Sequence, residues 1–244
     1  MRSLQQSNHC RGNILDFNVN NRWVFSVGGV EVWITDTIVN TWIIGLVLIG
    51  AAVVVRLRLR RFEEVPKGIQ NAAEAVVELF DNFLVSSAGE GLRLLGGWFF
   101  TVFAFLLFAN LSGLGGLRPP TADWSMAFAL ALVTLVLIHA MGIKFRGKKH
   151  FKDLLVPHWL FLPINIIGEL ARPVSLSFRL FGNMLAGVIL IGLMYGVTPV
   201  FVRFIAPTVL HFYFDIFAGA LQAYIFCILS LSFIGVAANT EFDS

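Results

Sequence analysis

Arg179 lies near the middle of a 34-residue, largely apolar stretch, Ile164–Val197. Its guanidinium stays protonated at physiological pH, so the side chain cannot shed its charge inside lipid. Placing such a charge at the centre of a membrane helix costs about 2.5–3.5 kcal/mol on insertion scales and about 10–17 kcal/mol in simulations. A sequence keeps such a residue where it lines a polar path or meets a mobile counter-charge. Arg179 therefore predicts ion movement.

Further polar side chains stand at regular depths in this stretch and in the next apolar stretch, Ile205–Ala238. If two helices run in opposite directions across the bilayer, the eighteenth residue of the second, Gln222, lies level with Arg179. Residues three or four apart share a helix face, and this spacing sorts the side chains by depth. The sets are an outer one, a central one and an inner one: His211 and Asp215; Arg179, Asn183 and Gln222; Glu169, Arg172 and Ser175.

This arrangement predicts a polar route that a fixed positive charge interrupts at its centre. The charge would repel a cation that crosses directly, yet it would attract a carboxylate on a moving partner. Plainer interpretations remain for the neighbouring residues. Gln222, Asn183 and Asn110 suit hydrogen bonds between helices, while Glu169 and Arg172 are three residues apart and suit an ion pair. Asp215 and His211 also suit the membrane interface.

The composition is that of a membrane protein. Apolar residues make up 57% of the chain and charged residues only 14%, against about 25% charged in soluble domains. Five apolar blocks are long enough to cross a bilayer as helices, and none alternates with the period of a strand. We predict an all-α membrane protein with spans near residues 38–55, 96–117, 124–143, 164–197 and 205–238.

The last two blocks would measure about 51 Å as helices, against a hydrocarbon core of about 30 Å, so we expect them to tilt steeply or to break. Residues 70–84 place apolar side chains at helical spacing opposite acidic ones. They predict an amphipathic surface helix that lies on the membrane, on a neighbouring subunit or on this chain itself. Residues 1–37 are read as an outer tail with a short hairpin near Trp23–Thr35, and residues 38–244 as one membrane domain.

Basic residues set the predicted orientation. Eleven of the eighteen Lys and Arg follow the first or the third span. By the positive-inside rule these connections face the cytoplasm, which puts the N-terminus outside and the C-terminus inside. The chain has two cysteines and no metal-ligand spacing, and it has no feature that calls for a cofactor or nucleic acid. We expect no metal site and no catalysis by this chain alone.

The run Pro173-Val-Ser-Leu-Ser-Phe-Arg-Leu-Phe-Gly-Asn183-Met-Leu-Ala-Gly187 resembles the signature of subunit a of F-type ATP synthases. Leu221–Phe226 is similar to that family's motif in the last helix, and weaker matches are Val65–Asn71 and Asn110. The resemblance covers most of the chain from about residue 25 onward. Where some relatives have an acid, this chain has Val188 and Gly113, and Asp215 stands where some have a histidine.

The resemblance implies a stator subunit of the membrane sector that packs against a ring of c subunits, with peripheral-stalk b subunits and the rest of the F1Fo complex as further partners. It implies two offset half-channels for H⁺, separated by Arg179, with Asn183 and Gln222 near the ring and the outer acid supplied by Asp215. A bacterial cell membrane is the expected location, with an organellar membrane as the alternative. The residues leave open a sodium-translocating version, or a stand-alone channel or transporter.

Overall fold

The computed structural model describes residues 21–27, 30–58, 68–150, 159–197, 199 and 205–238. Most of the predicted outer tail and the connections at 59–67, 151–158 and 200–204 therefore lie outside the described residues. The described chain begins with two antiparallel strands, β1 (Asn21–Val27) and β2 (Val30–Thr35), in which Val27 pairs with Val30 and Asn21 with Thr35. Strand β2 leads directly into the first long helix.

Five helical stretches are long and apolar enough to cross a membrane, which confirms the predicted all-α membrane fold. Their bounds agree with the predicted spans to within a few residues at most ends. The helical elements are α1 (Asp36–Arg58), α2 (Ile69–Ala88), the 3₁₀ turn η1 (Glu90–Leu95), α3 (Gly96–Leu111), the 3₁₀ turns η2 (Ser112–Gly115) and η3 (Pro120–Ala122), α4 (Trp124–Arg146), the 3₁₀ turn η4 (Trp159–Phe161), α6 (Leu162–Val197), α7 (Ile205–His211), the π-helical segment η5 (Phe212–Ala218) and α8 (Gly219–Ala238).

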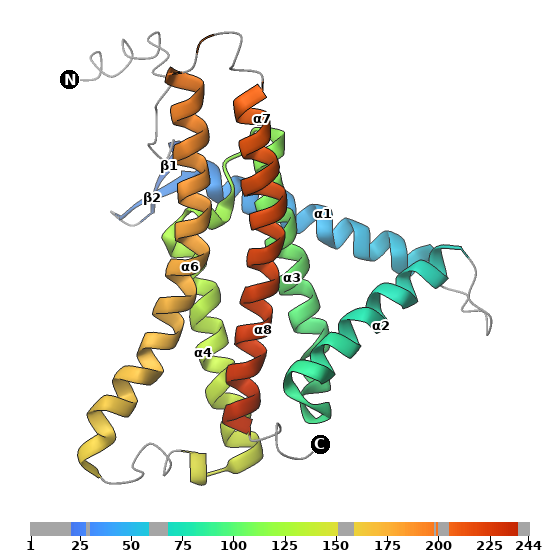
Figure 1. Ribbon diagram of the computed structural model, residues 1–244, viewed down its shortest axis with the longest axis vertical. Helices are drawn as coiled ribbons and strands as arrows, with labels where there is room; N and C mark the ends of the chain where they lie inside the picture. The colour runs from blue at the N-terminus through green and yellow to red at the C-terminus, as the bar shows by residue number, and fades with distance from the viewer. Residues whose placement is uncertain are drawn as a thin grey trace.

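The last helix is the centre of the bundle. In its most apolar 18-residue segment, 50% is buried inside the chain, against 11% in the corresponding segment of α1. Helix α1 diverges from the other helices at a steep angle (Figure 1). Helix α4 packs against both α6 and α8, and α2 and α3 pack against α8. Ala131 of α4 and Ala223 of α8 are fully buried in one apolar cluster with Leu180 of α6. Small side chains at these positions let the helices approach closely.

Helix α2 confirms the predicted surface helix and extends it at both ends. Its C-terminal half packs on this chain. Leu84 is fully buried in one apolar cluster with the C-terminal half of α8, and the ring centroids of Phe83 and Tyr224 lie 5.4 Å apart. Val76 and Val77, in its N-terminal half, are 51% and 59% exposed. The helix thus covers the foot of its own bundle and leaves a second apolar surface for lipid or another subunit.

The two long helices, of 36 and 34 residues, differ in their helical geometry. Helix α6 runs through Pro173 without a break for 36 residues, about 54 Å at 1.5 Å per residue. The last helix instead changes from α to π geometry at Phe212 and returns to α geometry at Gly219. The two helices lie side by side at the α7 end and separate toward the other end of the molecule (Figure 1). We call the α7 end of the molecule the upper end and the opposite end the lower end.

Candidate functional site

His211 and Asp215 form a short polar contact on the last helix. His211 ends α7 and Asp215 lies in the following π segment, so they are four residues apart. The Nδ1 atom of His211 lies 2.6 Å from Oδ2 of Asp215, whose side chain is only 7% exposed. The predicted outer pair is therefore brought together by the structure. A hydrogen bond of this length between an imidazole and a buried carboxylate gives one proton two neighbouring positions.

Gly113 makes room for this carboxylate from the opposite side. A Cβ atom on Gly113 would lie 2.8 Å from the carboxyl atoms of Asp215, which is closer than side chains approach one another. Sequence reasoning noted only that Gly113 lacks the acid that some relatives have. The signal that it missed is steric, because a glycine in the turn after α3 lets an acid from the last helix take that space.

The pair opens into a cavity of about 560 Å³ between α6, η5 and the turn after α3, which we call the upper pocket. Tyr195 of α6 lines it as well, with its ring centred 6.3 Å from that of His211. Val188 is a wall residue of the same cavity. Tyr195 was not predicted, although it lies on the same helix face as Val188, seven residues further on.

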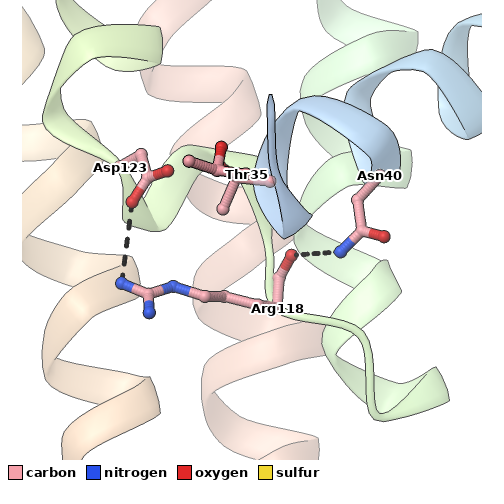
Figure 2. Close-up of polar contacts among 5 residues, drawn as sticks. Thr35, Asn40, Arg118 and Asp123 are labelled. Carbon is pink, nitrogen blue, oxygen red and sulfur yellow. Dashed lines mark hydrogen bonds and ion pairs between the residues drawn. The ribbon is translucent and has the colours of Figure 1, made fainter. Parts of the chain in front are cut away.

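Arg118, which also lines the upper pocket, is a second residue that sequence reasoning missed. Figure 2 shows the contacts of Arg118 with Asn40 of α1 and with Asp123, the residue before α4. Asn40 of α1 donates to its backbone carbonyl at 3.0 Å, and its guanidinium lies 3.6 Å from the carboxylate of Asp123. The upper pocket therefore has a fixed positive charge in its wall besides the His–Asp pair.

The central polar residues are separated rather than clustered. Asn183 of α6 donates to the backbone carbonyl of Ala218 in the last helix, at 3.4 Å. Gln222 is 5% exposed, and its Nε2 atom has no hydrogen-bond partner among the described residues. No hydrogen bond in the described part of the chain joins Arg179 to either amide. Asn183 and Gln222 nevertheless flank the same α6–α8 boundary, because Ala218 lies one helical turn before Gln222.

Arg179 lies at the surface of the chain. Its residue is exposed, and among the described residues it has neither a hydrogen bond nor an ion pair. It lines a cavity of about 270 Å³, the lower pocket, together with Ser175 of α6 and Leu229 and Phe233 of α8. The predicted inner residue Ser175 therefore shares a cavity with the central arginine. Among the described residues, Glu169 pairs with Arg172 and Asp215 with His211, so neither acid forms a salt bridge with Arg179.

Glu169 and Arg172 form the ion pair that their spacing allows. One guanidinium nitrogen of Arg172 lies 3.0 Å from each carboxylate oxygen of Glu169. The Arg172 guanidinium also lies over the Phe233 ring, 5.3 Å from its centre. Arg172 lines the lower pocket, whereas the Glu169 carboxylate is bound at its edge.

The two pockets share no lining residue, and on α6 they are separated by residues 180–184. The lower pocket reaches up to Arg179 and the upper pocket begins at Leu185, about 9 Å further along the helix axis. Leu180 and Met184, which lie between, are at most 2% exposed. In the described part of the chain, no three His, Cys, Asp or Glu side chains come together as a metal site would require. Among the described residues, the two cavities therefore lie at different levels of α6 and have separate linings.

Five apolar helices carry a buried carboxylate bonded to a histidine and an arginine that has no partner among the described residues. These features define a polytopic membrane protein of the ion-transporting class. The model of the family described as ATP synthase A chain matches residues 38–235. The chain therefore belongs to the ATP synthase subunit a family, the membrane-sector subunits of that enzyme.

Curated relatives agree over most of the chain. It is 38% identical over 211 residues to ATP synthase subunit a of Desulfosudis oleivorans, covering 82% of this chain and 86% of that one. It is 36% identical over 202 residues to the subunit a of Syntrophobacter fumaroxidans, with 81% and 82% covered. A third relative, at 34% identity over 227 residues with 86% and 76% covered, is the subunit a of Propionigenium modestum, named as sodium ion specific.

Proposed function

We propose that this chain is the proton-conducting stator subunit of a rotary ATP synthase. The observation that carries the proposal is the separation of the two pockets: one contains the His211–Asp215 pair, the other ends at Arg179, and they share no lining residue. Two cavities at different depths are what two offset half-channels need. The chain would supply no catalytic group of its own, and ATP would form elsewhere in the F1Fo complex.

The exposed surface around Arg179 fits a rotor helix. Ser175, Arg179, Gly182 and Ala186 follow each other at spacings of three or four residues, and all are exposed in this chain. The side chains beside the arginine are thus small, which lets a partner helix come close to the backbone. A membrane helix of the c ring that carries a carboxylate would bring that group to a guanidinium that has no partner among the described residues. Peripheral-stalk b subunits would occupy other surfaces.

Transport would begin at the upper pocket. A proton enters past His211 to Asp215 and neutralises a ring carboxylate in the region of Asn183 and Gln222. The neutral carboxyl can then turn into lipid, which a charged carboxylate could do only at a large cost. After nearly a full rotation the group reaches the lower pocket beside Ser175. There the proton leaves past Glu169, and Arg179 stabilises the carboxylate that remains.

Arg179 also acts as the barrier in this proposal. Its fixed charge lies at the upper end of the lower pocket, and a proton that continued straight toward the upper pocket would be repelled. The driving energy comes from the membrane potential, about 2.3 kcal/mol per charge for 100 mV. Several protons are therefore needed for each ATP.

The transported ion is proposed to be H⁺ because the upper pocket presents an acid that is hydrogen-bonded to a histidine, and this pair exchanges protons. Sodium is the second candidate, favoured by the relative that is named as sodium ion specific. Vesicles that contain the whole complex would distinguish them. ATP-driven quenching of a pH-sensitive dye without sodium supports H⁺, whereas quenching that disappears and sodium uptake that replaces it would support Na⁺.

The orientation follows from the basic residues at the lower end. Lys144, Arg146, Lys148 and Lys149 gather where α4 ends, so this end would face the cytoplasm, with the upper pocket outside. We place the chain in the plasma or inner membrane of a bacterium, with its N-terminus outside and its C-terminus inside; an organellar membrane is the alternative. Protease access to tags at the two termini in intact cells tests this.

A stand-alone channel or transporter is the rival from another class. Such proteins often carry internal repeats, and none is evident in this sequence. Purification separates the two proposals. A tagged chain extracted in mild detergent should bring with it a c ring and a peripheral stalk, and a chain that conducts protons alone after reconstitution would contradict the stator proposal.

A further inference from the structure

We propose that Asn110 of α3 is a positioning residue that holds the π-helical register of the last helix and so directs Asp215 into the upper pocket. The consequence for transport rests on the function proposed above. The structural part, a link between one buried amide and the geometry of a neighbouring helix, does not depend on it.

The π segment sets the rotation of the residues before it relative to the residues after it about the helix axis. The Gly219 N–H is shared between the carbonyls of Ile216 and Phe214, three and five residues earlier, where an α-helix would use the fourth. A segment of this kind takes up about one extra residue, and one residue corresponds to about 100° of rotation in an α-helix. If residues 212–218 became α-helical, His211 and Asp215 would turn by roughly that angle relative to Gln222. Asp215 would then leave the space beside Gly113.

Asn110 meets the helix where the π geometry ends. Its Nδ2 atom donates to the backbone carbonyl of Gly219 at 2.9 Å, and its Oδ1 atom accepts from the Thr121 hydroxyl at 2.7 Å. Both side chains are fully buried. The Thr121 bond fixes which end of the amide faces the helix, because the oxygen is already occupied by a donor. The nitrogen is therefore presented to Gly219.

The donor comes from a neighbouring helix, at the point where the last helix changes its geometry. A carbonyl whose partner is displaced by a change of helical register finds no water in the hydrocarbon region, and such helices rely on side chains of neighbouring helices. Asn183 gives the carbonyl of the preceding residue, Ala218, a second and longer contact of 3.4 Å. The junction at 218 and 219 thus receives amide donors from two different helices. Of the two, the Asn110 contact is the shorter and the more deeply buried.

Gly219 is fitted to the same contact. A Cβ atom at this position would lie 2.8 Å from Cβ of Asn110, so any larger residue would push the amide away. Asn110, Thr121 and Gly219 therefore form one buried unit from α3, η3 and α8. We assign to it the role of fixing the helix register, in place of simple packing between helices.

A disulfide between α6 and the π segment reports this register directly. Gly187 contacts Phe214, and a Cβ on Gly187 would lie 3.1 Å from Cβ of Phe214, so a shift of a few tenths of an ångström gives the separation of about 3.5–4.5 Å found in disulfides. The pair Gly187→Cys and Phe214→Cys is placed in the assembled complex after Cys10 and Cys227 are replaced by Ala. With Asn110 present, mild oxidation should cross-link most of the chain, as gel mobility would show.

Asn110→Leu, which keeps the volume and removes the donor, should lower the cross-link yield at least about tenfold, because a rotation of about 100° carries position 214 off the α6 face. Thr121→Val should lower it less, since only the orientation of the amide is lost. Asn82→Leu is the matched control, because Asn82 is exposed on α2 and should leave the yield unchanged. An unchanged yield in both Asn110→Leu and Thr121→Val would overturn the proposal.

Deleting one residue from the π segment gives an independent test. Phe217 is 56% exposed, and its removal would let residues 212–218 become α-helical while both flanks keep their faces. The deletion should therefore restore the cross-link in the Asn110→Leu chain, or restore its accumulation if that chain fails to assemble. If the deletion restores neither, the register does not depend on Asn110. If the deletion restores the cross-link but the complex still fails to pump protons with ATP, the register assignment holds and the result counts against the proposed function instead.

Discussion

The upper and lower pockets handle charge in opposite ways. In the upper pocket the acid is enclosed: Asp215 is 7% exposed, bonded to His211 and confined by Gly113. In the lower pocket the central charge is left open, because Arg179 is exposed and has no partner among the described residues. The difference indicates that the upper pocket fixes one proton site in place, whereas the lower pocket presents a charge to a group that comes from outside the chain.

The two helices that line the pockets also differ in their helical register. Helix α6 contributes to both pockets with a single α-helical register, so the depth of Arg179 relative to Val188 follows from their spacing alone. The last helix contributes through two registers that meet at Gly219. The position of the acid relative to the arginine therefore depends on a tertiary contact, and each pocket should fail in its own way when it is altered.

Replacing Arg179 by Ala should have the largest effect. With the open charge removed, nothing would separate the pockets or attract the ring carboxylate, so coupled ATP synthesis should fall at least about 100-fold, equivalent to about 2.7 kcal/mol. Vesicles should also leak protons passively. Synthesis and the decay of a pH gradient can be measured on the same membranes. Arg93→Ala is the control, because Arg93 is 61% exposed and pairs with Asp81 away from both pockets. Normal ATP-driven pumping in Arg179→Ala would refute the barrier role.

Asp215→Asn should have the next largest effect. It keeps the shape of the enclosed side chain but removes the group that accepts a proton from His211, so the rate of proton uptake should fall by about 100-fold, the lower range for loss of a general acid–base. Passive leak should not rise, which distinguishes this variant from Arg179→Ala. Proton flux through F1-stripped vesicles measures the rate. Asp81→Asn, on α2, should match the unmodified chain, and a rate unchanged by Asp215→Asn would reduce Asp215 to an interface residue.

Much of this comparison follows from the sequence because it depends on regular helices. Hydropathy predicts the five spans, and a spacing of four residues brings His211 to Asp215 as expected. The spacing of three residues between Glu169 and Arg172 likewise predicts the ion pair that the structure has, one of the two interpretations left open. Depth along α6 was predictable for the same reason, because an unbroken helix converts residue number directly into height.

The π segment and the notch at Gly113 could not be predicted in this way. One extra residue within a 34-residue apolar helix changes neither its hydropathy nor its length in any visible manner. The register is decided by Asn110, about a hundred residues earlier in the chain, through a contact that exists only after folding. The roles of Arg118 and Tyr195 in the pocket wall are tertiary for the same reason.

Gly113→Ala should disturb the upper pocket by a smaller amount. The new methyl group would lie 2.8 Å from the Asp215 carboxyl atoms, so the carboxylate must shift away from its contact with His211. We expect proton uptake to slow about tenfold, or about 1.4 kcal/mol, with little change in passive leak. Gly115→Ala is a matched control in the same turn, since a Cβ there meets nothing within 4 Å. Equal rates for the two variants would show that the notch does not position the acid.

Glu169→Gln should have the smallest effect. The Arg172 guanidinium already balances the Glu169 carboxylate, and both side chains are partly open to solvent, with 32% and 19% of their areas exposed. Such pairs contribute about 0–1 kcal/mol to stability, so the variant should assemble normally. As an acceptor at the edge of the lower pocket, Glu169 can be replaced in part by water, and we expect proton release to slow about threefold, or about 0.65 kcal/mol. Glu78→Gln, on the exposed side of α2, provides the baseline for the flux measurement. If the proton flux of Glu169→Gln fell as much as that of Asp215→Asn, the lower pocket would also depend on one fixed acid. That result would contradict the contrast between the enclosed acid of the upper pocket and the open charge of the lower pocket.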